Sequence, residues 1–385
     1  MLTIRSQFSN HFNDSPALVV NSPGRINLIG EHTDYNHGFV LPAAIDKYIE
    51  VAIGKRTDGA IHMVALDLGE TIILPIDNLT PHATQWVNYI IGAVDQAFNR
   101  MKAANETKLA AGFNICIQGN IPLGAGLSSS AALECAVLFA LNELYNLSLS
   151  RMQMALMAQA AEHKFAGVKC GIMDMFASLH GQKNKAILLE CDSLAFTYYP
   201  IELKDYSIVL FDTQIKHALA FSEYNTRRLE CEQGLKIIQE KYAFVKTFRD
   251  ISLEQVEECL VSKVYQRCKY VVEEIARVQL AVKDLASGDM QAFGKKMFET
   301  HEGLSKLYEV SCPELDFLVN EVSHNENVLG ARMMGGGFGG CTINIIKSTS
   351  VEAITRELSA KYNQAMHKEL SYYITSIEDG THLVA

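Results

Sequence analysis

The first third of the chain carries two spacings of apolar residues, one typical of strands and one of helices. In KYIEVAIG (47–54) and FNICIQ (113–118), apolar and polar residues alternate, which predicts half-buried strands. Between them, QWVNYIIGAVDQAF (85–98) repeats its apolar positions every three or four residues and is expected to be helical. The same spacing returns from Ser128 onward and predicts a second helix with one buried face.

A third helix is expected over RMQMALMAQAAEHKFAG (151–167). It ends at Gly167, and glycine is the residue type favoured just past a helix. Beyond it, the apolar runs at 185–190 and 206–211 predict two strands that form a pair.

The second half of the chain has a different texture. The pattern is almost wholly helical over 219–325, and a strand (341–346), a helix (350–368) and a short final strand follow. Strands followed by helices, without strict alternation, favour an α+β fold. Because 385 residues exceed one ordinary domain, we expect two lobes, residues 1–195 and 196–385.

Composition narrows the function classes. The chain is 48% hydrophobic and 20% charged, which is typical of globular proteins. Its net charge is −10 with no basic stripe, so nucleic acid is not an expected partner. No apolar run reaches the roughly 18 residues of a membrane span, and nothing at the start resembles a signal peptide. Nine cysteines are scattered singly, which favours buried free thiols over a metal cluster and predicts a cytoplasmic protein.

The first stretch with a chemical signal is PLGAGLSSSAALE (122–134), which leads into the second helix. The start of a helix leaves N–H groups unpaired and carries partial positive charge, so it attracts anions. Small residues let a phosphate approach the backbone, and the hydroxyls can bond an oxyanion or a metal. The alternative is a serine N-cap after a tight turn. The candidate phosphate-binding residues are Gly124, Ala125, Gly126, Leu127, Ser128, Ser129 and Ser130.

A second stretch, RMMGGGFGGCTINII (332–346), formally contains GxGxxG. In a dinucleotide-binding fold these glycines open a helix, whereas here they run into a predicted strand, so that interpretation fails. The glycines still indicate unusual backbone dihedrals or close contact with a ligand. A bulged hairpin explains them equally well.

The third stretch, SPGRINLIGEHTDYNHGFVLPAAID (22–46), gathers Arg25, Glu31, His32 and Asp34 in an expected loop. Carboxylates and an imidazole suit a polyhydroxylated ligand, because each hydroxyl of a sugar both donates and accepts a hydrogen bond. Zinc binding through histidines is disfavoured because HExxH is absent. A solvated polar loop stays open as the alternative.

Four blocks together resemble the galactokinases of the GHMP small-molecule kinase superfamily. GRINLIGEHTDYN (24–36) is similar to the signature of that family, and PLGAGLSSSAALE to the phosphate loop of the superfamily. GGGFGGC (335–341) is similar to its third motif, and AEHKFAGVKCGIMD (161–174) to a further block. The resemblance implies a two-lobed GHMP kinase fold, with a mixed-sheet N-terminal lobe, a helix-rich C-terminal lobe and the active site between them. It also implies phosphoryl transfer from ATP to the 1-hydroxyl of D-galactose, the first committed step of galactose catabolism.

The resemblance also implies roles for individual residues. Asp174 and Arg25 correspond to the catalytic pair, and Ser130 and Glu162 to the ligands of Mg²⁺. ATP is expected on residues 124–130, with Trp86 near the adenine or, equally, in the core. Galactose is expected to meet Glu31, His32, Asp34, Gly171, Asp174 and Tyr224.

Two neighbouring functions stay open at this stage. An N-acetylgalactosamine kinase has the same motifs, and nothing in the sequence measures the space near the 2-hydroxyl. A catalytically silent galactose sensor would lose part of the phosphate loop, whereas Ser128, Ser129 and Ser130 are all present. We expect a monomer.

Overall fold

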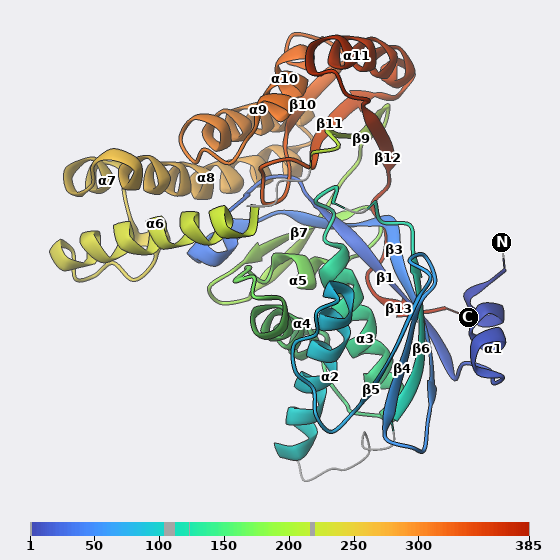
Figure 1. The fold of residues 1–385 in the computed structure, drawn as a ribbon. Helices are drawn as coiled ribbons and strands as arrows, with labels where there is room; N and C mark the ends of the chain where they lie inside the picture. The colour runs from blue at the N-terminus through green and yellow to red at the C-terminus, as the bar shows by residue number, and fades with distance from the viewer. Residues whose placement is uncertain (1, 104–111, 123, 216–219, 385) are drawn as a thin grey trace.

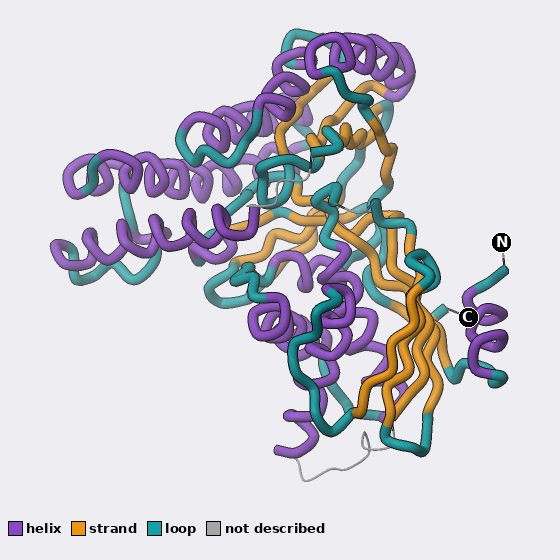
Figure 2. Tube along the Cα trace, in the orientation of Figure 1, coloured by secondary structure: helices purple, strands orange, loops and turns teal. Residues whose placement is uncertain are grey.

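The computed structural model describes residues 2–103, 112–122, 124–215 and 220–384. The chain forms two masses that lie against each other, and each contains both strands and helices (Figure 2). The predicted α+β class is confirmed, because the described part combines mixed and antiparallel sheets with helices in separate layers. In that part no helix has both the length and the apolar character that crossing a membrane requires.

The first mass is built on a six-stranded sheet in the order β13-β1-β3-β6-β4-β5. The β4–β6 pair is parallel and its neighbours are antiparallel, so the sheet is mixed. The strands span β1 (Leu18–Asn27), β3 (Pro42–Lys55), β4 (Ala60–Ala65), β5 (Glu70–Pro75), β6 (Gly112–Gly119) and β13 (His382–Leu383).

Helices cover both faces of this sheet (Figure 1). One face carries α2 (Gln85–Ala103), α3 (Ser129–Tyr145), α4 (Arg151–Ala161) and α5 (Met173–His180). α3 is apolar nearly all round, which suits its place between the sheet and the other helices. The short α1 (Ile4–Phe12) packs Ile4 and Phe8 against the opposite face.

The second mass contains an antiparallel sheet in the order β10-β11-β9-β12. Its strands are β9 (Tyr206–Asp212), β10 (Val328–Met333), β11 (Cys341–Lys347) and β12 (Ser371–Thr375). α9 (Met290–Lys306), α10 (Pro313–Val322) and α11 (Val351–Met366) pack around it, whereas α6 (Ala220–Lys241), α7 (Leu253–Cys259) and α8 (Ser262–Ser287) project to one side (Figure 1).

A three-stranded sheet, β2-β7-β8, lies where the two masses meet. It consists of β2 (Phe39–Val40), β7 (Lys185–Glu190) and β8 (Phe196–Pro200). One apolar cluster there joins Ile26, near the end of β1, and Ile29, in the loop after it, to Leu210 and Ile343 of the second sheet. The loop after β1 is therefore clamped between both halves of the chain.

Most predicted elements are confirmed, with two corrections. The segments 185–190 and 206–211 are strands, but they do not pair with each other: β7 joins β2 and β8, whereas β9 joins β11 and β12. Alternation shows that a strand has a buried face and cannot show its partner. The segment 22–46 is not one loop either, because β1 and β3 contain much of it.

The expected lobe boundary at residue 195 falls between two paired strands. β7 and β8 pair across it, and β13 returns from the C-terminal end to the first sheet.

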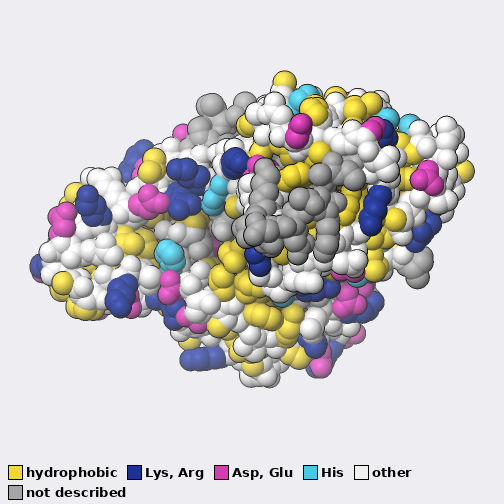
Figure 3. All heavy atoms as spheres, turned by 90° about the horizontal axis from the view of Figure 1, so that it is seen from below, with side chains coloured by type: hydrophobic (Ala, Val, Ile, Leu, Met, Phe, Trp, Pro, Cys, Tyr) yellow, Lys and Arg dark blue, Asp and Glu magenta, His cyan; other side chains and the backbone are white. Residues whose placement is uncertain are grey.

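Charges of both signs are interspersed on the face seen in Figure 3.

Candidate active site

A cavity of about 450 Å³ opens between the two masses. It is lined by the start of α3, the loop after β1, the start of α5, and the loop from β10 to β11. All but two of the predicted site residues line it, so the motifs that lie far apart in the sequence converge here. Those lining it are Arg25, Glu31, His32, Asp34, Gly124, Gly126, Leu127, Ser128, Ser129, Ser130, Glu162, Gly171, Asp174 and Tyr224.

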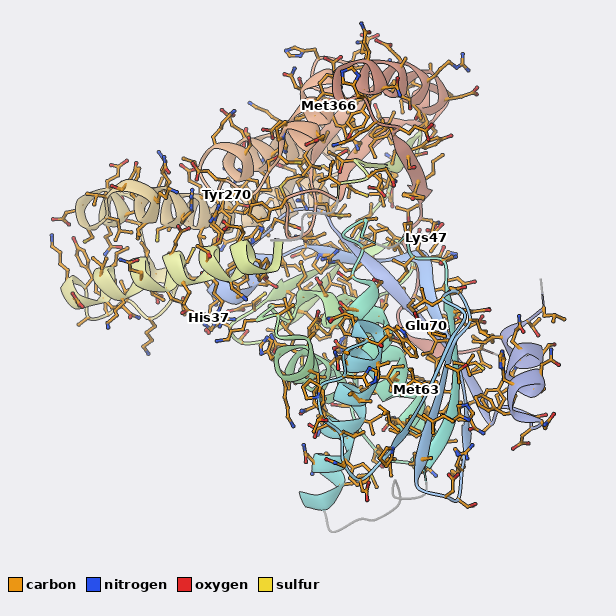
Figure 4. The ribbon with its side chains drawn as sticks, in the orientation of Figure 1. His37, Lys47, Met63, Glu70, Tyr270 and Met366 are labelled. Carbon is orange, nitrogen blue, oxygen red and sulfur yellow. The ribbon has the colours of Figure 1, made fainter. Side chains whose placement is uncertain are left out.

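The two exceptions are Ala125 and Trp86. Ala125 is fully buried behind the phosphate loop, in the cluster that joins the two masses. The indole N–H of Trp86 donates to Glu70 Oε2 at 2.6 Å, and the ring packs against the apolar core between the first sheet and its helices. Figure 4 labels Glu70 within the first sheet. One turn along α2, Tyr89 reaches the cavity wall instead.

The start of α3 is arranged as an anion site without a side-chain cap. Ser128 sits at the N-cap position in the left-handed region, at φ 59°, and its side chain does not bond the backbone of the helix. The simple serine-cap alternative is therefore wrong. The N–H groups of the first turn therefore have no side-chain cap, and Ser129 and Ser130 of that turn line the cavity, which suits an anionic ligand.

Asp174 is held by hydrogen bonds to both carboxylate oxygens. Arg25 Nε donates to Oδ1 at 2.7 Å, and the Ser128 hydroxyl donates to Oδ2 at 2.6 Å. The other end of the Arg25 guanidinium donates to the carbonyl of Gly126 at 2.7 Å. The carboxylate is thus tied to the loop that the sequence assigned to phosphate.

The charge of Arg25 is secured by its neighbours. Burial alone lowers the pKa of this guanidinium, but the carboxylates of Asp174 and Glu31 outweigh burial and raise it. Arg25 is only 4% exposed, so its attraction for nearby anions is weakly screened by water.

Asp34 lies against the backbone that leads to Asp174. A Cβ atom added to Gly171 would lie 1.8 Å from Asp34 Oδ2, so only glycine allows this approach. Burial raises the pKa of Asp34 to about 7, and the negative charge of Asp174 adds to the effect. The carboxyl groups of Asp34 and Asp174 are therefore close enough for the charge of Asp174 to disfavour ionisation of Asp34.

Glu31 connects the loop after β1, which carries the signature block GRINLIGEHTDYN (24–36), to the glycine-rich loop. Its carboxylate accepts hydrogen bonds from the side chain of Asn27, the backbone N–H of Gly335 and Nη2 of Arg332, the last at 3.1 Å. Its own carbonyl accepts from the hydroxyl of Tyr270 at 2.9 Å, a residue of α8 labelled in Figure 4. Glu31 is therefore committed largely to contacts within the protein.

The glycine-rich loop (335–340) connects the two strands of a hairpin. β10 and β11 are antiparallel neighbours, but their register shift lies at Val328 and Gly330, at the far end of the pair, so a bulge does not explain the glycines. The glycines line the cavity. Gly337 has φ +81°, and a Cβ there would lie 2.1 Å from the carbonyl oxygen of Val310, so the loop needs glycine at that position.

His32 forms an aromatic cluster with residues from the second mass. Its ring lies 5.4 Å from that of Tyr224 on α6 and 4.9 Å from that of Tyr308. Its backbone is in the left-handed region at φ 63°, an uncommon conformation that often marks functional sites. Burial, together with Arg227, lowers the pKa of His32 to about 3, so the ring is neutral.

The predicted metal ligands face each other at the wall of the cavity. The Ser130 hydroxyl donates to Glu162 Oε1 at 3.2 Å, and Glu162 begins a π-helical turn (Glu162–Ala166) after α4. Burial raises the pKa of Glu162 to about 7, with a contribution from Asp174. Glu134, fully buried on α3, lies beside it, and burial raises the pKa of that carboxyl as well.

Sequence reasoning missed Glu134 and the true partner of Ser128. A carboxylate on an otherwise apolar helix face was the available signal for Glu134. The described residues contain no cluster of three or more His, Cys, Asp or Glu side chains suited to a metal. The few ligands predicted for Mg²⁺ would leave most of its coordination to phosphate and water.

Comparison with known proteins identifies the family. Three family models match: the galactokinase galactose-binding signature over residues 6–55, the GHMP kinase N-terminal domain over 88–182, and the GHMP kinase C-terminal domain over 281–364. A galactokinase of Clostridium beijerinckii is 40% identical over 385 aligned residues, covering 98% of this chain and 97% of the relative. One of Thermotoga maritima is 38% identical, covering 94% and 99%. The chain belongs to the galactokinase family.

Solved structures agree with this assignment. Galactokinase of Lactococcus lactis, crystallised with galactose, matches with a TM-score of 0.92 at 33% identity and covers 98% of both chains. A mevalonate kinase of Methanococcus jannaschii, at 19% identity and a TM-score of 0.66, shares the fold. The expected GHMP kinase fold and the expected class, an ATP-dependent sugar kinase of the galactokinase family, are confirmed.

Proposed function

We propose that this chain transfers the γ-phosphoryl group of ATP to the anomeric hydroxyl of D-galactose, with Asp174 and Arg25 as the catalytic residues. One observation carries the assignment of roles: the Asp174 carboxylate, held on both oxygens, lies in a cavity that the phosphate loop and the sugar-signature loop share. An anion at the start of α3 and a sugar at Asp34 would meet beside that carboxylate.

Asp174 acts best by orienting the hydroxyl and accepting its proton late. An anomeric hydroxyl titrates near ~12 and an ordinary Asp near ~3.9, so complete prior deprotonation would cost about 11 kcal/mol. A loose phosphoryl-transfer transition state asks little of the nucleophile, so the proton can move as the bond to phosphorus forms. Arg25 then stabilises negative charge on the transferring group, because its guanidinium is charged, buried and in contact with both Asp174 and the phosphate loop.

The residues present fit a magnesium ion. Ser130 and Glu162 offer a hydroxyl and a carboxylate, the oxygen ligands that Mg²⁺ prefers. The raised pKa of Glu162 indicates a carboxyl that lacks enough positive charge nearby, and a cation would supply it. When bound, the ion would neutralise charge on the phosphates of ATP.

Galactose is proposed to occupy the part of the cavity formed by His32, Asp34, Gly171 and Tyr224, with Glu31 at its edge. Carboxylates there accept from sugar hydroxyls, and His32 and Arg25 supply donors. Residues 124–130 are proposed to hold the triphosphate.

The proposal is tested with a panel of hexoses and N-acetylgalactosamine, each incubated with Mg-ATP and the purified protein. We expect D-galactose to be phosphorylated fastest, with ³¹P and ¹³C NMR placing the phosphate on carbon 1. Phosphorylation of another sugar at a higher kcat/KM, or at another carbon, would refute the assignment. ADP release without sugar phosphate would do so too.

We also propose that the enzyme works as a monomer in a reducing compartment, the cytoplasm. All nine cysteines are free, and six of them are buried in the apolar clusters of the protein. Light scattering at working concentration measures the mass directly, and 42.7 kDa is expected.

A further inference from the structure

A chain of hydrogen bonds leads from helix α6 to the ring of His32. Nδ1 of His32 lies 2.7 Å from the hydroxyl of Tyr35, and that hydroxyl lies 2.9 Å from the hydroxyl of Tyr308. The Tyr308 hydroxyl lies in turn 3.2 Å from Sγ of Cys231. Tyr308 and Cys231 are fully buried, so bulk water does not reach the far end of this relay.

Each group in the relay keeps one proton at neutral pH. Burial raises the pKa of both tyrosines well above the usual value and the pKa of Cys231 to about 12. His32 is neutral, and one of its two ring nitrogens therefore carries a proton. The hydrogen bonds can consequently all point toward His32 or all point away from it.

The direction toward His32 is the stronger one. In it, Tyr35 donates to Nδ1, and an imidazole nitrogen is a good acceptor. In the opposite direction the last acceptor is the sulfur of Cys231, which is weak. When Nδ1 accepts this hydrogen bond, the one proton of the neutral ring must lie on Nε2. That nitrogen is buried and forms no hydrogen bond of normal geometry, and the backbone of Gly336, which lines the same cavity, interacts with the ring.

We propose that Tyr35, Tyr308 and Cys231 are positioning residues that fix the Nε2–H tautomer of His32, so that this nitrogen donates a hydrogen bond to the sugar. The second half of this inference rests on the proposed galactose site. The Nε2–H group would supply a donor that the sugar site needs. Ionised Asp34 and Asp174 can only accept hydrogen bonds, so a sugar hydroxyl that donates to one of them needs a separate donor for its lone pairs. A Nδ1–H tautomer would present a third acceptor.

The tautomer can be read in the free protein, without any sugar. Long-range ¹H–¹⁵N correlation spectra distinguish the protonated ring nitrogen from the bare one, and the His32→Gln variant assigns the signals. We expect Nε2 to be protonated in the wild type. Tyr35→Phe, which removes only the hydroxyl beside the ring, should give a mixture of tautomers. Tyr308→Phe removes the acceptor that Tyr35 needs in the opposite direction, so it should retain the Nε2–H tautomer.

Galactose binding gives the second readout. Tyr35→Phe should weaken galactose binding by about three- to tenfold, the worth of one hydrogen bond between neutral groups, with the KM for ATP unchanged. Tyr372→Phe, on an exposed edge of β12, is the matched control and should change neither quantity. Cys231→Ser places a better acceptor at the end of the relay and should shift the tautomer toward Nδ1–H, whereas Cys231→Ala removes that acceptor and should retain the wild-type tautomer.

The outcomes separate the relay from the sugar contact. A wild-type protein protonated on Nδ1, or a Tyr35→Phe variant with unchanged tautomer, would overturn the relay. An unchanged galactose affinity in His32→Gln would overturn the contact with sugar, whatever the spectra show. Thermal unfolding of each variant checks that the fold is intact. If Tyr308→Phe unfolds, the Cys231→Ser and Cys231→Ala pair decides the same question.

Discussion

The hydroxyl of Ser128 offers a sharp test of how the carboxylate is held. The sequence assigned it to phosphate, whereas the structure shows it donating to Asp174 Oδ2 at 2.6 Å. Removing the hydroxyl should therefore impair the chemical step and leave nucleotide binding nearly intact. Ser129, the next residue, lines the same cavity and is the matched control.

The size of the effect follows from the kind of bond. A hydrogen bond to a charged group contributes about 1.5–3 kcal/mol, which corresponds to a decrease in kcat of roughly 10- to 150-fold. Two variants separate chemistry from stability. Ser128 has φ 59°, so Ser128→Gly relieves a left-handed backbone that Ser128→Ala retains. Both should lose activity, and the glycine variant should melt no lower than the alanine variant.

The assay is coupled detection of ADP at saturating galactose, with ATP varied. We expect Ser128→Gly and Ser128→Ala to lower kcat and to change the KM for ATP by less than about twofold. Ser129→Ala should instead raise the KM for ATP. If Ser128→Gly keeps the wild-type kcat and raises the KM for ATP, the hydroxyl serves the phosphates, and the role we give it beside Asp174 is wrong.

Three further predictions concern the same cavity. Asp174→Asn should nearly abolish turnover while ATP still binds, as calorimetry can show. Arg25→Lys should also lower kcat severely, because an ammonium cannot bond Asp174 and the Gly126 carbonyl together as the planar guanidinium does. A kcat near that of the wild type in either variant would refute the role of that residue. Gly171→Ala should raise the KM for galactose and spare that for ATP, because its Cβ would displace the Asp34 carboxylate. Since the pKa of Asp34 is raised to about 7, its carboxyl stabilises the free protein below pH 4, and this stabilisation is lost as pH rises through 7. Galactose, which we propose binds the ionised form, should bind about tenfold more weakly at pH 6 than above pH 8, and Asp34→Asn should flatten that profile.

Much of the site could be predicted because the physics of each motif is local. A helix that starts after small residues attracts anions wherever it lies, and that expectation for residues 124–130 needed no tertiary information. The strands at 47–54 and 113–118 carried their own alternation in the same way. By contrast, Asp174 was one carboxylate among 44 acidic residues until the resemblance singled it out.

Partners of individual side chains could not be predicted, because they depend on elements distant in the chain. The Ser128 hydroxyl reaches Asp174 only because α5 packs beside the start of α3, 46 positions away. The carboxylate of Glu31 reaches the N–H of Gly335 only because the second sheet closes over the loop after β1. The sequence around each of these residues contains no pattern that predicts either contact.

The same contacts show how sugar and nucleotide sites are coupled. Arg25 donates to Asp174 and to the carbonyl of Gly126, so one guanidinium joins the carboxylate to the phosphate loop. Glu31 joins the signature loop to Gly335 of the glycine-rich loop across the two halves of the chain. A ligand that shifts either loop therefore moves a group that the other ligand needs. Residues assigned to a ligand from sequence can thus act through another residue, and only the three-dimensional structure distinguishes the two roles.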